Sequence, residues 1–132
     1  MPTNSFLDSN VLLYLLEPGT RKSQRSRGLV SAGAFVSVQV LNEYSDVARR
    51  KRMLCWDDIV NSLEPIKESC VVLPVNIAVH ERALSIVRET NLRIFDANIV
   101  AAAELAGCDV LYTEDLNNGQ RIGRVTIVNP FI

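Results

Sequence analysis

Short runs of apolar residues alternate along the chain with longer segments in which apolar residues return every three or four positions. The short runs are rich in β-branched and aromatic residues, which is typical of buried strands. They cover residues 6–7, 34–38, 70–75, 109–113 and 125–128. The longer segments have the period of helices that bury one face. They run from the N-cap types Asp8–Asn10 to Pro18-Gly19, and over residues 20–33, 39–53, 56–69, 76–91 and 96–107.

Strands that alternate with helices in this way predict one α/β domain over residues 1–132, a three-layer α/β/α sandwich with a mostly parallel central sheet. The continuous apolar run at 70–75 is expected in a sheet that is covered on both faces. We expect the helix over 56–69 to be interrupted or to end near Pro65. Ligands of such folds bind outside the carboxyl ends of the strands, so the chemistry should lie there.

The composition narrows the class of protein. Hydrophobic residues make up 48% of the 132 residues and charged residues 22%, which is typical of a folded globular protein. The net charge of −1 provides no global positive field for nucleic acid. Cys55, Cys70 and Cys108 form no CxxC pair, and we expect buried reduced thiols. A signal peptide and a membrane-spanning run are absent, so we expect a cytoplasmic protein without membrane contact.

Four carboxylates fall at strand ends or helix starts. Asp8 follows the first strand directly. Asp115 comes after the fourth strand, separated from it by Glu114. Asp96 opens an Ala-rich helix, and Glu43 lies early in the helix after the second strand. Taken singly, each has an ordinary explanation as a helix cap, a turn former or a solvated residue. In a parallel sheet, however, all four converge at one end.

Converging carboxylates repel one another, and some of them take up protons unless a cation is present. Hard divalent ions prefer such all-oxygen sites, and Mg²⁺ in particular keeps several waters and uses few protein carboxylates. The chemistry that uses this arrangement is metal-assisted hydrolysis of phosphodiesters. A phosphatase of the haloacid dehalogenase type is disfavoured, because its second Asp is replaced by Asn10.

Four sequence blocks carry a family resemblance. "FLDSNVLLYLL", "VSVQVLNEY", "IFDANIVAAA" and "LYTEDLNNGQ…VTIVNPF" resemble, in that order, the signature blocks of PIN-domain ribonucleases. They are most similar to the VapC-like toxins of type II toxin–antitoxin pairs. The resemblance extends from Phe6 to Phe131.

The resemblance implies a PIN-like sandwich and an endoribonuclease that depends on Mg²⁺ or Mn²⁺. It also implies a homodimer that cleaves RNA and is neutralised by a cognate antitoxin protein. The catalytic and metal-binding acids of the family fall on Asp8, Glu43, Asp96 and Asp115, and supporting residues fall on Asn10 and Thr113. Either Glu114 or Asp115 could be the inward acid; alternation along an extended segment favours Asp115, on the side of Thr113.

A cationic rim should accompany an acidic site that binds RNA. Two clusters are available, and we favour Arg49, Arg50, Lys51 and Arg52 over Arg21, Lys22, Arg25 and Arg27, because the first cluster ends the helix that carries Glu43. Two other functions stay open: a housekeeping PIN nuclease in RNA processing, and a catalytically weak binding module of the same fold.

Overall fold

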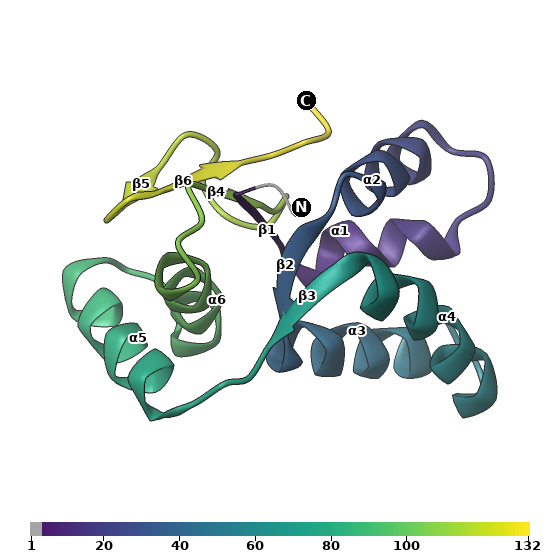
Figure 1. The fold of residues 1–132 in the computed structure, drawn as a ribbon, viewed down its shortest axis with the longest axis horizontal. Coiled ribbons are helices and arrows are strands. Elements are labelled where there is room, and N and C mark those ends of the chain that lie inside the picture. The colour runs from purple at the N-terminus through teal and green to yellow at the C-terminus, as the bar shows by residue number, and fades with distance from the viewer. Residues whose placement is uncertain (1–3) are drawn as a thin grey trace.

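A six-stranded sheet forms the centre of the computed structural model, which describes residues 4–132 (Figure 1). The first three residues of the predicted domain lie outside the described part. The strands are β1 (Ser5–Leu7), β2 (Ala34–Ser37), β3 (Cys70–Leu73), β4 (Val110–Tyr112), β5 (Arg121–Ile122) and β6 (Val125–Val128). Their order is β3-β2-β1-β4-β6-β5, and all pairs are parallel except the antiparallel pair β5–β6. The prediction of a mostly parallel sheet is therefore confirmed.

Helices cover both faces of this sheet and complete the predicted three layers. They are α1 (Ser9–Leu13), the 3₁₀ helix η1 (Tyr14–Leu16), α2 (Arg21–Ser31), α3 (Val38–Arg50), α4 (Trp56–Ser69), α5 (Ile77–Glu89) and α6 (Ile94–Leu105). α5 and α6 lie together on one side, and α1 to α4 lie on the other (Figure 1). In residues 4–132, no helix has the length and apolar character needed to cross a bilayer.

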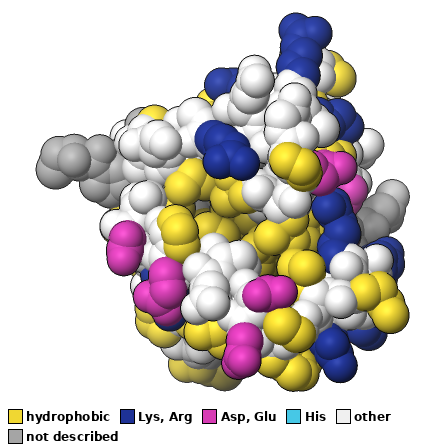
Figure 2. Space-filling model, turned by 90° about the vertical axis from the view of Figure 1, so that its right-hand side faces the viewer, with side chains coloured by type: hydrophobic (Ala, Val, Ile, Leu, Met, Phe, Trp, Pro, Cys, Tyr) yellow, Lys and Arg dark blue, Asp and Glu magenta, His cyan; other side chains and the backbone are white. Residues whose placement is uncertain are grey.

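An apolar groove lies on the outer side of the α1–α4 layer. Figure 2 faces this end of the molecule and shows a hollow of hydrophobic side chains with charged side chains around it. The groove has a volume of about 320 Å³ and runs between η1, α2 and α4. Its lining includes Leu16, Val30, Ser31, Pro65 and Ile66.

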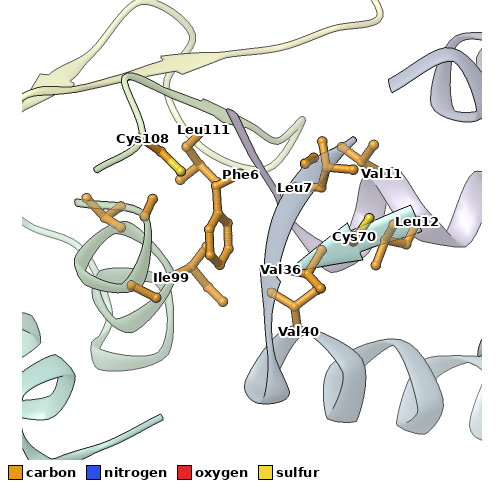
Figure 3. Packing of buried hydrophobic residues seen from close by; sticks show 14 of the residues in the cluster. Phe6, Leu7, Val11, Leu12, Val36, Val40, Cys70, Ile99, Cys108 and Leu111 are labelled. Carbon is orange, nitrogen blue, oxygen red and sulfur yellow. The ribbon is translucent and has the colours of Figure 1, made fainter. Parts of the chain in front are cut away.

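The central strand β1 is short but fully buried, because its side chains serve both layers. Phe6 and Leu7 have no exposed surface, and they point to opposite faces of the sheet. Phe6 points toward Ile99 of α6, and Leu7 points toward Val11 of α1 (Figure 3). Burial of such a side chain stabilises the fold by about 1.5–3 kcal/mol. The strand ends at Leu7, so the next residue, Asp8, is held firmly at the carboxyl edge of the sheet.

Several local predictions need correction. Pro65 does not interrupt α4, which is continuous over 56–69. The amide that a proline lacks would have bonded the carbonyl of Asn61, and since Asn61 is exposed, water can bond that carbonyl instead. The helix predicted over 39–53 ends at Arg50, before Met53, whose φ is 59°. Strand β5, only two residues long, has no apolar pattern and was not predicted.

The thiols also differ from the expectation. Cys70 and Cys108 are buried, but Cys55 is exposed. Cys55 is the residue before the first turn of α4 and lies in the loop that leaves α3, where no second layer covers it. All three cysteines are free.

An ion pair joins α5 to α6 next to the β5–β6 turn. The guanidinium of Arg82 donates to both carboxylate oxygens of Glu104, with Nε–Oε1 at 2.5 Å and Nη2–Oε2 at 3.3 Å. Gly123 forms the turn with φ +58°, and a Cβ at this position would fall 1.8 Å from Glu104 Oε2. The turn therefore needs glycine both for its backbone conformation and for the space that the ion pair occupies.

Candidate active site

Asp8 lies where β1 ends and α1 begins. Its backbone amide extends the pairing of β1 by donating to the carbonyl of Tyr112 at 3.0 Å. Its side chain caps α1, because Oδ1 accepts from the amide of Ser9 at 2.7 Å. The other oxygen, Oδ2, accepts from the hydroxyl of Thr113 at 2.9 Å. Only 5% of the residue is exposed, so the carboxylate is a helix cap and at the same time a buried acid.

Asn10 joins the first and the fourth strand ends. Its Nδ2 lies 2.9 Å from Thr113 Oγ1, 3.1 Å from Asp115 Oδ2 and 3.4 Å from Asp8 Oδ2. Its Oδ1 accepts from the amide of Glu114 at 3.2 Å. A neutral amide thus stands between two carboxylates and keeps the loop after β4 against α1.

Asp115 and Glu114 point to different sides. Asp115 faces Asn10, whereas the Glu114 carboxylate accepts from the hydroxyl of Tyr14 and from Lys22 Nζ, the latter at 3.1 Å. The side chain of Thr113 faces Asp8 and also accepts from the amide of Asp115 at 3.2 Å. Of the two neighbouring acids, Asp115 is therefore the one beside Asp8.

Glu43 reaches the same region from the second turn of α3. Its Oε2 accepts from Ser9 Oγ at 3.3 Å, and its Oε1 accepts from Gln39 Nε2 at 3.0 Å. Gln39 also donates to the carbonyl of Phe95 at 3.0 Å, which ties α3 to the start of α6. Sequence reasoning missed Ser9 and Gln39, although the i,i+4 spacing of Gln39 and Glu43 on a helix was a usable signal.

Asp96 is the third residue of α6, two residues after the helix start at Ile94. It is therefore in the first turn, where the helix dipole favours an acid, and not at the first position as predicted. Partial burial raises the pKa of Asp96, the charge of Arg93 lowers it, and the charge of Asp115 raises it. The fourth acid thus interacts electrostatically with the loop after β4.

The pKa of Asp8 is raised mainly by burial and further by the neighbouring acids. Burial raises the pKa of Asp8 to about 6, although the hydrogen bonds from Ser9 and Thr113 act in the opposite direction. The negative charges of Glu43 and Asp115 raise it further. At neutral pH a carboxyl group with this pKa is mostly ionised, so a buried negative charge stands beside other acids.

The donors suit a hard divalent cation. Among residues 4–132, no group of three acidic, His or Cys side chains is placed so that it could hold a metal ion. Mg²⁺ does not need such a group, since it keeps most of its waters and binds proteins through one or two carboxylates. Asp8 and Asp115, held at one amide, with Glu43 and Asp96 near them, provide oxygen ligands only. These residues fit Mg²⁺ or Mn²⁺.

The favoured basic cluster lies away from the acids. Arg49 to Arg52 occupy the last turn of α3 and the residues after it, six to nine residues beyond Glu43, which is roughly 9–14 Å along a helix axis. Arg50 pairs with Asp46 at 2.6 Å. Arg49 donates to the carbonyl of Leu54 at 3.1 Å and lies over the ring of Trp56. The contacts of Arg49 and Arg50 among residues 4–132 are thus with their own neighbourhood and not with the acids of the site.

Comparisons with known proteins agree with the geometry. A family model described as PIN domain matches residues 5–123. No curated protein matches the sequence significantly. Three solved structures are similar over most of their length. VapC20 of Mycobacterium tuberculosis, described as a sarcin–ricin loop cleaving toxin, has a TM-score of 0.66 at 18% identity and covers 84% of this chain and 91% of its own.

The second is a toxin–antitoxin complex from Klebsiella pneumoniae, with a TM-score of 0.70 at 20% identity over 96% of this chain and 98% of that one. The third is VapBC2 of Rickettsia felis bound to a promoter DNA fragment, with a TM-score of 0.69 at 14% identity. The match covers 93% of this chain and 96% of that one. At these identities the likeness establishes the fold.

Proposed function

The chain belongs to the PIN domain family, and we propose that it is a metal-dependent endoribonuclease that acts as the toxin of a toxin–antitoxin pair. Within the chain, the observation that carries this proposal is the convergence of four acids from separate elements: the charges of Glu43 and Asp115 act on the buried Asp8, and the charge of Asp115 acts on Asp96. The names of the structural neighbours support the biological role, since one is a toxin that cleaves the sarcin–ricin loop and another is a toxin–antitoxin complex.

The acids divide the work according to their positions. Asp8, Asp96 and Asp115 would hold Mg²⁺ or Mn²⁺, directly or through its waters, at the carboxyl edge of the sheet. When bound, the cation would neutralise charge on the scissile phosphate and lower the pKa of the attacking water. Glu43, turned by Ser9 and Gln39, would position that water or take its proton.

Two neutral side chains fix this arrangement. Thr113 donates to Asp8, and Asn10 spans Asp8 and Asp115, so the two acids keep their places although they repel one another. Both act as positioning residues rather than as groups that touch the phosphate. Preorganised ligands of this kind avoid reorganisation at the moment of reaction.

Cleavage of RNA by the purified protein tests the activity. We expect cleavage in Mg²⁺ or Mn²⁺ and none in EDTA. Asp8→Asn should lower the rate roughly 100-fold or more, because the buried ligand loses its charge. Asp109→Asn is the matched control, since Asp109 is exposed and pairs with Arg124 at 2.9 Å. Full metal-dependent cleavage by the Asp8→Asn variant would refute the assignment.

The toxin role needs a partner, and the apolar groove between η1, α2 and α4 is our candidate for the antitoxin surface (Figure 2). A groove of this kind accepts the apolar face of an amphipathic helix. Expression of the chain alone should arrest growth, and co-expression of the adjacent reading frame should restore it. Ser31→Arg, at an exposed lining position, should abolish the rescue and leave toxicity intact.

Two other readings predict different outcomes. A housekeeping nuclease would cleave RNA without arresting growth, and a silent binding module would do neither. We also propose a homodimer, which size-exclusion chromatography with light scattering would measure directly.

A further inference from the structure

A cavity lined by basic side chains lies near the acids. It has a volume of about 430 Å³ and is formed by the start of α2 and the segment after β6: Arg21, Lys22, Arg25, Pro130, Phe131 and Ile132. No acidic side chain lines this cavity. The basic residues of α2 thus divide into two groups, because Arg27 lines the apolar groove instead.

The cavity is connected to the acid cluster through one residue. Lys22 Nζ pairs with Glu114 at 3.1 Å, and Glu114 is the chain neighbour of Asp115. The topology explains this proximity. β6 runs parallel to β4 and β1, so the segment that follows Val128 leaves the sheet at the same carboxyl edge as Asp8.

Contacts hold Lys22 and Arg25 in place, but the three cations keep donors that have no protein acceptor among the described residues. Lys22 lies 4.9 Å from the ring centroid of Tyr14 and 5.4 Å from that of Phe131. Arg25 uses Nε to bond the carbonyl of Pro130 at 3.1 Å, which leaves its two terminal nitrogens without a protein acceptor among residues 4–132. The side chain of Arg21 has no hydrogen bond or ion pair with any described residue.

Two of these cations, Arg21 and Lys22, lie in the first turn of α2, where the helix dipole disfavours positive charge. α2 begins at Arg21 and has no acid in its first turn, so positive side chains add to the positive end of the helix dipole. The sequence accepts an electrostatic cost at this end, and an anion in the cavity would remove it. The ordered C-terminal segment closes the other wall, since Asn129 bonds the amide of Phe131 at 2.9 Å and its own amide is bonded by Asn118.

We propose that this cavity binds a backbone phosphate of the RNA substrate, next to the phosphate that is cleaved. The inference rests on the proposed nuclease function and specifies the path of the strand. It assigns the cationic rim to Arg21, Lys22 and Arg25 instead of the end of α3. An acidic site repels RNA, and a phosphate held at the neighbouring cavity offsets that repulsion. Arginine provides the planar donor fork that phosphate oxygens match.

Binding of a fluorescently labelled single-stranded RNA tests the proposal. Fluorescence anisotropy, measured in EDTA over a range of salt concentrations, separates binding from cleavage. The Arg21→Gln/Arg25→Gln variant should lose about tenfold in affinity at low salt, and the slope of log K against log[salt] should fall by about 0.7, the value for one lost phosphate contact. The control is Arg50→Gln/Arg52→Gln, which removes the same charge at the end of α3 and should change the affinity less than about twofold.

A single variant shows whether a loss of RNA binding comes from misfolding. Arg21→Gln removes no hydrogen bond or ion pair within residues 4–132, so it should keep the unfolding temperature and still weaken RNA binding. Equal losses in both double variants would indicate a general charge effect and overturn the proposal. Unchanged affinity in the Arg21→Gln/Arg25→Gln variant would also overturn it, and if antitoxin rescue were then lost, the cavity would be a peptide site.

The outcome for the cavity is separable from that for the nuclease. If the wild type binds RNA through Arg21 and Arg25 but cleaves none, the phosphate site stands and the enzymatic function fails. If the wild type cleaves RNA and the double variant binds as well as the wild type, the nuclease stands and the phosphate site is refuted.

Discussion

Asp8→Asn should change how the stability of the metal-free protein depends on pH. The pKa of Asp8 is raised from 3.8 to about 6 by burial. Between these values the folded protein keeps a proton that the unfolded chain has released, so the free energy of unfolding falls as the pH rises from about 4 to about 6. Two pKa units at 1.36 kcal/mol each give a loss of about 3 kcal/mol, complete above pH ~6.

Chemical denaturation in EDTA at a series of pH values measures this loss. Asn cannot titrate, so the difference in unfolding free energy between the variant and the wild type should shift in favour of the variant by about 3 kcal/mol between pH ~4 and pH ~7. The comparison uses the change of this difference with pH, and a hydrogen-bond mismatch of Asn, which does not depend on pH, therefore cancels. Saturating Mg²⁺ should stabilise the wild type and reduce the gap.

Asp46→Asn is the control for the sign of this effect. Arg50 lowers the pKa of Asp46, so this acid stabilises the fold above its unfolded pKa and loses that contribution as the pH falls. Because this pKa is lowered, the difference curve should be flat between pH ~4 and ~7 and should change only below pH ~4, with the opposite sign and a small size since the pair is exposed. If the unfolding free energies of Asp8→Asn and the wild type changed in parallel between pH ~4 and ~7, the raised pKa of Asp8 would be refuted.

Three further substitutions separate positioning from packing. Asn10→Ala removes the amide between Asp8 and Asp115 and should cost about 1–3 kcal/mol in urea denaturation; with the acids no longer held, RNA cleavage should fall in kcat more than in KM. Gly123→Ala, at φ +58° beside the ion pair of α5 and α6, should lower the unfolding free energy by about 1–3 kcal/mol. Gly28→Ala, in open space on α2, should raise it by about 0.5–1 kcal/mol, and a loss there would contradict the helix-propensity argument.

The layers and the parallel sheet could be predicted because they depend on the spacing of apolar residues along the chain. The strand at 70–75 and the helix at 76–91 each repeat one local pattern, and tertiary packing follows that pattern. β5 could not be predicted, because Arg121 and Ile122 pair with β6 only through a turn that Gly123 permits. The predicted break at Pro65 was wrong for a related reason. The cost of proline in a helix depends on whether water can bond the carbonyl that loses its amide partner, and the sequence does not show this.

For the site, topology was enough to bring distant acids to one edge, but not to orient them. That Asp8 follows one strand and Asp115 another is visible in the sequence. That Asn10 spans them depends on side-chain geometry across more than a hundred residues. The prediction that Arg49–Arg52 bind RNA rests on their position after Glu43 along α3, and sequence alone does not show which way side chains at the end of a helix extend.

Two unfavourable charge arrangements of opposite sign lie at the same edge of the sheet. Asp8 is an acid buried beside other acids, and α2 begins with cations at the positive end of its dipole. Each costs stability in the isolated protein, and each would be relieved by a ligand of the opposite charge: a divalent cation for the acids and a phosphate for the arginines. Violations that occur far from function are usually removed by substitution, whereas those at a site persist because the ligand offsets them. An RNA strand with its metal would supply both charges at once, so the proposed substrate accounts for both features together.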